Sequence, residues 1–290
     1  MKQTSIFLPM KKTIDYVGFA SQKGEIDVYL APGKEVKLVL FYHGFKGFKD
    51  WGAWHLMVEQ FTKRGLSIAL MNGTHNGIGS NLTEFTELDL FSRNSISAEQ
   101  KDIKEAFFTL EEFLKSSDLT LKEKHLIGHS KGGANVILFA KHNAGIKSVS
   151  SWAGVADWES LFSFAEKEQW KKDGVLHVTN ARTGQDLPLS HEIWVDYNQN
   201  EEHWNIMKAA SELPMPLLLI HGTEDEVIPI GQSRQIYDLC LHALLIPIER
   251  ANHTFGASHP WTEEVLPTHL DEVLESTIDF ILDSDTEIMY

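Results

Sequence analysis

The sequence predicts an α/β fold in which a mostly parallel central sheet carries helices on both faces. Short apolar segments of strand length alternate with amphipathic segments of helix length along most of the chain. Strands buried on both faces have this continuously apolar character. A glycine-rich turn at residues 128–133 lies between one such strand and one such helix. Together these observations indicate one sheet whose functional residues lie at the strand ends.

The first strands come from the N-terminal part of the chain. Residues 13–19 and 25–30 predict an antiparallel pair, and the second of them alternates polar and apolar side chains as a half-buried strand does. Residues 37–42 and 67–71 are more continuously apolar, which predicts two buried strands. The segment between them, residues 52–64, predicts a helix.

A long helix is expected after a polar loop at residues 72–94. Ser97 and Gln100 have the spacing of a capping box, in which two side chains satisfy free backbone amides at a helix start. The segments 124–128 and 134–141 then predict a strand and a helix on either side of the glycine-rich turn. The apolar residues that recur at helical spacing behind the capping box are Ile103, Ala106, Phe107, Leu110, Phe113 and Leu114.

The C-terminal part repeats the same alternation of strands and helices. Residues 148–154, 216–220 and 243–248 predict strands. Residues 230–240 predict a helix between the last two strands, and residues 270–282 predict a final amphipathic helix.

Residues 155–212 interrupt this rhythm. We therefore expect a core made from residues 1–154 and 213–290, with residues 155–212 as a cap-like insertion over the functional end of the sheet. Within it, residues 175–179 and 185–189 predict a hairpin. Its aromatic side chains either line the site or form only a small core of the insertion itself. They are Trp158, Phe162, Phe164, Trp170, Trp194, Tyr197 and Trp204.

Composition narrows the class of protein. The 290 residues are 42% hydrophobic and 23% charged, as in a globular domain, and no apolar run approaches the ~20 residues of a membrane span. The short apolar piece at residues 6–10 precedes two lysines, which is the wrong order for a secretory signal. Cys240 is the only cysteine, which suits a reducing cytoplasm. The net charge of −15 disfavours nucleic acid and anionic membranes as partners.

The glycine-rich turn supplies a candidate nucleophile, Ser130. Residues 128–132 read Gly-His-Ser-Lys-Gly, and a serine in this pattern between a strand and a helix lies on a sharp turn that exposes its hydroxyl. A serine hydroxyl needs a base to take its proton and an acid to orient that base. In this arrangement the acid and then the histidine follow the serine along the chain.

The acid candidate is Asp225, which follows the strand at 216–220. The carboxyl end of a strand is where an open α/β sheet places its site. Glu224 and Glu226 are its competitors on the same loop. The spacing from Gly222, with a proline closing the loop, favours Asp225.

The base candidate is His253, which follows the strand at 243–248. His259 and His269 also follow the acid, but one precedes a proline in a looser loop and the other begins the final helix. His221 ends a strand, which favours a packed, hydrogen-bonded role. His129 is expected to point away from Ser130.

Two backbone amides are expected to stabilise the oxyanion that forms when Ser130 attacks a carbonyl. One is the amide of Lys131, directly after the nucleophile, and the other is that of Phe45, in the loop after the strand at 37–42. A Ser–Lys dyad is the alternative role for Lys131. Adjacent residues in this turn should not face each other, which disfavours the dyad.

The segments HGF (43–45), GHSKGG (128–133), HGTEDEVIP (221–229) and ANHTF (251–255) resemble the α/β-hydrolase superfamily. More narrowly, they resemble its dienelactone-hydrolase-like, cinnamoyl or feruloyl-esterase-like and serine-aminopeptidase-like branch. The resemblance covers about residues 36–283. It implies an α/β-hydrolase fold with Ser130 as nucleophile, Asp225 as acid, His253 as base, and Phe45 and Lys131 as oxyanion hole. Dienelactone hydrolases proper use a cysteine nucleophile, so their reaction does not carry over.

These observations predict a serine hydrolase that cleaves carboxylic esters through an acyl-enzyme. No cofactor or metal is expected, the partner is a small-molecule ester, and the protein is a monomer or homodimer. Trp158, Trp194 and Tyr197 are the candidate substrate-binding residues, which favours an aromatic or medium-length acyl group.

Two other functions stay open at this point. An exopeptidase or amidase of the same fold would need acidic groups for a free amino terminus, and Glu166, Glu168 and Asp173 are available in the insertion. The second alternative, from another class, is a catalytically silent hydrolase fold that binds a ligand.

Overall fold

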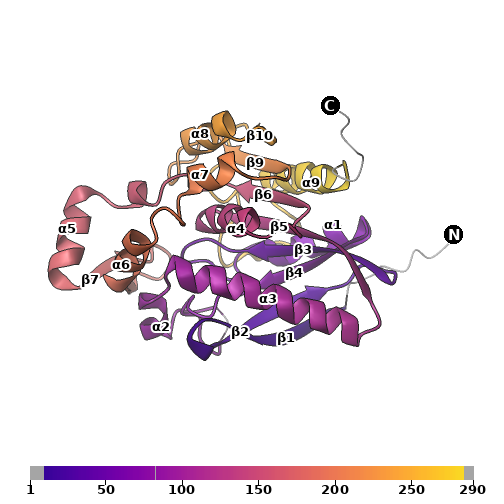
Figure 1. The fold of residues 1–290 in the computed structure, drawn as a ribbon, viewed down its shortest axis with the longest axis horizontal. Coiled ribbons are helices and arrows are strands. Elements are labelled where there is room, and N and C mark those ends of the chain that lie inside the picture. The colour runs from indigo at the N-terminus through magenta and orange to yellow at the C-terminus, as the bar shows by residue number, and fades with distance from the viewer. Residues whose placement is uncertain (1–9, 82, 284–290) are drawn as a thin grey trace.

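The computed structural model describes residues 10–81 and 83–283, and its centre is an eight-stranded sheet (Figure 1). The strands are β1 (Lys11–Val17), β2 (Lys23–Tyr29), β3 (Glu35–Tyr42), β4 (Leu66–Met71), β5 (Thr120–His129), β6 (Ser148–Trp152), β9 (Leu217–Gly222) and β10 (Ala243–Ile248). Their order is β1-β2-β4-β3-β5-β6-β9-β10. The pairs β1–β2 and β2–β4 are antiparallel, and every pair from β4 to β10 is parallel.

Helices cover both faces of this sheet. The α-helices of the described residues, including those that lie beyond the sheet, are α1 (Trp54–Lys63), α2 (Leu88–Ser92), α3 (Ile96–Ser116), α4 (Lys131–Lys141), α5 (Phe164–Asp173), α6 (Glu192–Gln199), α7 (Ile206–Ser211), α8 (Gly231–Leu239) and α9 (Thr268–Asp283). Side chains of α3, α4, α7 and α8 share one hydrophobic core, and those of α1 and α9 share the other. The predicted fold class is therefore confirmed.

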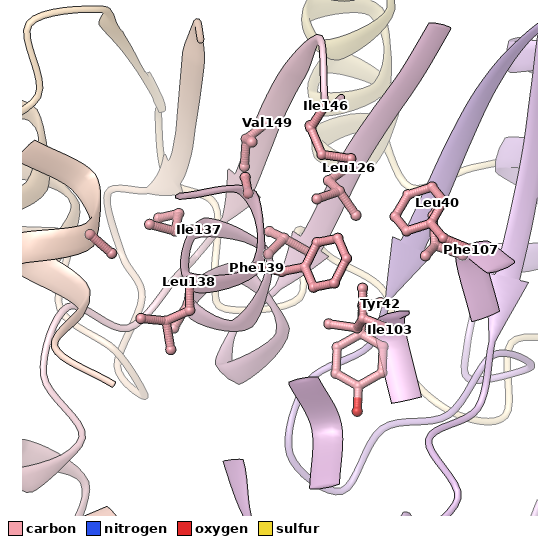
Figure 2. Close-up of a cluster of buried hydrophobic side chains, with 14 of the residues drawn as sticks. Leu40, Tyr42, Ile103, Phe107, Leu126, Ile137, Leu138, Phe139, Ile146 and Val149 are labelled. Atoms are coloured by element: carbon pink, nitrogen blue, oxygen red, sulfur yellow. The ribbon is translucent and has the colours of Figure 1, made fainter. Parts of the chain in front are cut away.

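Strand β3 shows why its sequence is continuously apolar. Leu40 and Tyr42 lie in the core under α3 and α4, while Val39 and Phe41 lie in the core under α1 and α9. Successive side chains of a strand point to opposite faces, so a strand covered on both sides needs apolar residues at every position. Figure 2 shows the first of these cores, with Leu40 facing side chains of α3 and α4.

The start of α3 differs from the prediction. Its N-cap is Ser95, whose side chain accepts a hydrogen bond from the Ala98 amide, so the predicted capping box at Ser97 and Gln100 is wrong. Ser97 lies in the first turn, and its hydroxyl donates to Asp196 of α6. Gln100 instead donates to the carbonyl oxygen of Asn135. The predicted loop at 72–94 also contains α2, a helix too short to show a sequence period.

The segment between β6 and β9 carries α5, α6, α7 and a two-stranded sheet of β7 (Val175–Thr179) and β8 (Asp186–Ser190). In Figure 1, α5, β7 and α6 project beyond the sheet, and β8 contacts α2. A separate apolar cluster joins this segment to the chain before α3. Its buried members are Phe48, Phe85, Phe91, Trp170, Leu187 and Leu189. Trp158, Tyr197 and Trp204 belong instead to the core beside α4, so the aromatics of this segment do not form one core of their own.

Among residues 10–81 and 83–283, no helix has the length and apolar character needed to cross a bilayer.

Candidate active site

Ser130 occupies a strained turn between β5 and α4. Its φ and ψ are 57° and −121°, and a non-glycine residue held at positive φ costs on the order of 1–3 kcal/mol. The neighbouring backbone leaves no room for side chains on either side. A Cβ at Gly128 would lie 2.1 Å from the Gly132 carbonyl oxygen, and a Cβ at Gly132 would lie 2.4 Å from that of Tyr42. The glycines thus allow the sharp turn that holds Ser130 at the start of α4.

Asp225 and His253 are in direct contact. After β9 the chain turns, and Asp225 Oδ1 accepts hydrogen bonds from the amides of Val227 and Ile228. Its Oδ2 lies 2.8 Å from His253 Nδ1, and neither side chain is more than 15% exposed. Burial raises the pKa of Asp225, but hydrogen bonds from His221 and His253 outweigh it and hold that pKa well below its usual range. Asp225 is therefore an ionised carboxylate at neutral pH.

The competing acids and histidines lie elsewhere. Glu224 and Glu226 are exposed on the same loop. His259 Nδ1 accepts a hydrogen bond from the Gly52 amide, and its ring stacks on Trp51. His269 lies in the first turn of α9.

His129 packs beside the candidate base. Its Nε2 donates to the His253 carbonyl oxygen at 2.8 Å, and the two rings lie 4.9 Å apart. Burial, with a smaller effect of His253, lowers the pKa of His129 to about 3. His129 is therefore a neutral group that holds the backbone of His253.

Ser130 and His253 line the same cavity. Among the described residues no hydrogen bond joins the Ser130 hydroxyl to His253, and in hydrolases without substrate this contact is often long.

The candidate oxyanion residues, Phe45 and Lys131, line the cavity as well. A Cβ at Gly44 would lie 2.9 Å from Ser130 Cβ, so the backbone before Phe45 passes directly against the nucleophile. The Lys131 ammonium is 2.8 Å from the buried carboxylate of Glu99. This ion pair occupies the lysine and argues against a Ser–Lys dyad.

The cavity has a volume of about 540 Å³ and mostly apolar walls. The three residues predicted to bind substrate, Trp158, Trp194 and Tyr197, all line it. So does Trp170, one of the other aromatic residues of the insertion, together with apolar residues that the sequence did not single out for this role, among them Phe91, Leu189, Ile193 and Ile228. Phe91 had no signal because it lies in the segment predicted as a loop.

The acidic residues considered for a free amino terminus are poorly placed. Glu166 lines the cavity, but its carboxylate accepts hydrogen bonds from the amide and the hydroxyl of Ser163. Glu168 and Asp173 do not line the cavity. Within the described residues, no three His, Cys, Asp or Glu side chains form a group that could hold a metal ion.

The sheet, the strained serine and the Asp–His contact define the class: this protein is a serine hydrolase of the α/β-hydrolase fold. It belongs to the prolyl oligopeptidase family, whose sequence pattern matches residues 91–257. No curated protein is detectably similar to the chain.

Solved structures share the fold at low sequence identity. Est1E from Butyrivibrio proteoclasticus, with bound ferulic acid, has a TM-score of 0.67 and 17% identity over 94% of this chain and 99% of its own. The dienelactone hydrolase of Anabaena variabilis has a TM-score of 0.62 and 16% identity over 95% and 98%. The acylaminoacyl peptidase of Pyrococcus horikoshii has a TM-score of 0.67 and 16% identity over 97% of this chain and 43% of its own. The resemblance to the α/β-hydrolase superfamily is confirmed.

Proposed function

We propose that the protein hydrolyses carboxylic esters through a Ser130–His253–Asp225 triad and an acyl-enzyme. The observation that carries this proposal is the 2.8 Å contact between Asp225 Oδ2 and His253 Nδ1, with His253 and Ser130 on one cavity. An ionised carboxylate at Nδ1 keeps the proton on that nitrogen and leaves Nε2 free to act as a base.

In the first half of the reaction, His253 Nε2 takes the Ser130 proton as the hydroxyl oxygen attacks the ester carbonyl. The amides of Phe45 and Lys131 stabilise the oxyanion, and each such donor typically contributes ~2.7–4 kcal/mol. His253 then gives its proton to the leaving alcohol. In the second half, His253 activates a water molecule that releases the acid and restores Ser130.

The cavity supports an ester with an apolar acyl or alcohol part, aromatic or of medium length. Its walls are largely aromatic and aliphatic, and Trp158, Trp194 and Tyr197 contribute to them. The similar structure of Est1E holds ferulic acid, which is an aromatic acid. A cavity of about 540 Å³ is within the range of small-molecule sites.

The second candidate is a peptidase or amidase, and membership of the prolyl oligopeptidase family favours it. The engaged carboxylate of Glu166 argues against recognition of a free amino terminus. A blocked or internal peptide would not need such an acid. The two functions therefore differ in the bond that is cleaved, and not in the triad.

A fluorophosphonate, which reacts with activated serines, tests the triad. We expect covalent labelling at Ser130 and none in Ser130→Ala. A panel of p-nitrophenyl esters and blocked and free aminoacyl-anilides then separates esterase from peptidase. Ester binding without turnover or labelling would instead identify a silent ligand-binding protein.

We also propose that the enzyme works without metal or cofactor, in the cytoplasm, as a monomer or homodimer. The single cysteine supports a location in the reducing cytoplasm. The net charge of −15 argues against nucleic acid as a partner. Activity that is unchanged by a strong chelator would support independence from a metal. The mass measured in solution tests the oligomeric state.

A further inference from the structure

The carboxylate of Asp225 contacts a second imidazole besides that of His253. His221, near the end of β9, is fully buried, and its Nε2 lies 3.1 Å from Asp225 Oδ2. His253 Nδ1 approaches the same oxygen at 2.8 Å. The proposed reaction assigns no role to His221.

The surroundings of His221 show that its Nε2 is an N–H donor. Its Nε2 lies 2.8 Å from the Ile228 carbonyl oxygen, which can only accept a hydrogen bond, so Nε2 carries a proton. Its Nδ1 lies 2.7 Å from the hydroxyl of Ser233, which is also fully buried and can donate to a neutral ring. His221 is therefore held with its Nε2 proton shared between Ile228 and Asp225.

The rest of the Asp225 carboxylate is held equally firmly. Oδ1 accepts from the amides of Val227 and Ile228, so all the donors together leave the carboxylate a single orientation. The His221 proton is the donor that fixes Oδ2, the oxygen that His253 uses. A carboxylate oxygen has room for two such bonds.

We propose that His221 is a positioning residue for the triad, which aims Asp225 Oδ2 at His253 and is itself held by Ser233. The inference rests on the proposed function, because it acts through the Asp225–His253 contact. Without the His221 proton, the carboxylate would be freer to rotate and more basic. It would then interact more strongly with the protonated form of His253, the form that cannot act as a base.

Three titratable groups from different elements face this carboxylate or its partner ring. They are His253 after β10, His129 at the end of β5 and His221 in β9. His129 stays neutral above about pH 3, so it adds no charge in the range where the enzyme would be assayed. A change in the pH–rate profile of a His221 variant therefore reports on the Asp225–His253 pair.

The test compares His221→Met, which removes the donor, with His221→Gln, whose amide can replace it. The matched control is His125→Met, because His125 is also fully buried, in strand β5 two strands away from β9, and its Nδ1 lies 2.8 Å from the Ser148 hydroxyl. Turnover of a p-nitrophenyl ester is normalised to the sites labelled by a fluorophosphonate. Melting temperatures report the structural cost of each change.

We expect His221→Met to lower kcat roughly tenfold with little change in KM, as loss of one buried hydrogen bond to a charge would. The acidic limb of its kcat/KM profile should move up by on the order of half a pH unit. His221→Gln should recover part of both effects. His125→Met should lower the melting temperature without moving the profile.

Two results would separate failure of this inference from failure of the proposed function. Full activity in Ser130→Ala would remove the triad, and the inference with it. An inactive Ser130→Ala together with wild-type kcat and an unshifted profile in His221→Met would overturn only the role of His221. If His221→Met does not fold, Ser233→Ala provides the test. We expect this variant to lower kcat several-fold and to shift the kcat/KM profile in the same direction. An unchanged kcat and an unchanged profile would contradict the proposal.

Discussion

At Ser130 the backbone adopts a conformation that a serine takes only when its neighbours enforce it. The φ of 57° is imposed by the close packing of β5, α4 and the loop after β3. The neighbours of Asp225 likewise hold its negative charge, because buried donors hydrogen-bond to both carboxylate oxygens in place of water. Ser130 and Asp225 are therefore each held in one conformation by the groups packed around them.

Asp225→Asn should keep the fold but lower kcat by about 10³–10⁴-fold, because an amide favours the wrong tautomer of His253. Ester turnover measured on folded protein checks this. Glu226→Gln, a change of the same kind at an exposed position on the same loop, should leave kcat within about twofold. Equal losses in the two variants would contradict the assignment of the acid.

A buried lysine supplies a prediction about stability. Lys49 is fully buried, with Glu25, Asp27 and Asp50 each within 2.9 Å of its ammonium group. Lys49→Met would remove the cation that Glu25 and Asp50 share and leave Asp27 with Lys11 as its remaining cation, so it should reduce the free energy of unfolding by about 3 kcal/mol. In the control Lys34→Met, which breaks the exposed Lys34–Asp118 pair, the loss should be at most about 1 kcal/mol. Urea unfolding measures both.

At the scale of elements, α4 lies so close to β3 that no side chain fits between them at Gly132. A Cβ there would lie 2.4 Å and 2.5 Å from the carbonyl oxygens of Tyr42 and His43, which are backbone atoms and cannot move aside. The same contact holds the loop after β3 against Ser130. The positions of α4, β3 and the loop after β3 therefore depend on one another.

Gly132→Ala should displace α4 or the loop after β3 and lower kcat/KM by about 10²-fold or more, as misplacement by 1 Å can. Gly231→Ala at the start of α8 is the matched control, since its Cβ would meet no atom within 4 Å. That variant should keep wild-type activity and stability. A fully active Gly132→Ala would show that the approach of α4 to β3 does not set the site geometry.

Helix α3 is tied to the strand ends by a carboxylate with an unusual titration. Asp102 accepts hydrogen bonds from the amides of Phe19 and Thr74, yet burial outweighs these bonds and raises its pKa to about 6. An unfolded aspartate titrates near 3.9, so the folded protein binds more protons between these two values. The contribution of Asp102 to stability should therefore fall as the pH rises from about 4 to about 6, by at most about 3 kcal/mol. Buried histidines with a lowered pKa, such as His129, contribute a slope of opposite sign in the same range. Their contribution cancels in the difference in unfolding free energy between the wild type and Asp102→Asn, and this difference should show the fall.

The sequence predicts most elements because sheet strands covered on both faces are recognisable from composition alone. Strand β3 and the turn at Ser130 are examples. Chain order, loop spacing and a position after a predicted strand together selected Asp225 and His253, which lie in contact. The start of α3 was predicted wrongly because Ser95 and Ser97 are both residues that can cap a helix, and the sequence does not distinguish them. Phe91 and Leu189 were missed as cavity residues because their position depends on packing between distant segments.

At the scale of the whole molecule, close to half of the residues that line the cavity come from the segment between β6 and β9. Trp194 lines the cavity and packs against Trp170 and Tyr197. Trp194→Ala should enlarge the acyl site and raise kcat/KM for bulky esters relative to acetyl esters by about tenfold. Phe164→Ala, in the same segment but 78% exposed, is the control and should leave this ratio unchanged. A Trp194→Ala enzyme with the wild-type ratio would place the acyl group elsewhere.

The apolar cluster of Phe48, Phe85, Phe91, Trp170, Leu187 and Leu189 fastens this segment to the chain ahead of α3. In the proposed reaction the reacting groups lie on turns and loops at the ends of sheet strands, whereas part of the cavity wall comes from side chains of this cluster, among them Phe91, Trp170 and Leu189. Substitution of a few of those aromatic residues would therefore change the substrate specificity and leave the proposed triad intact.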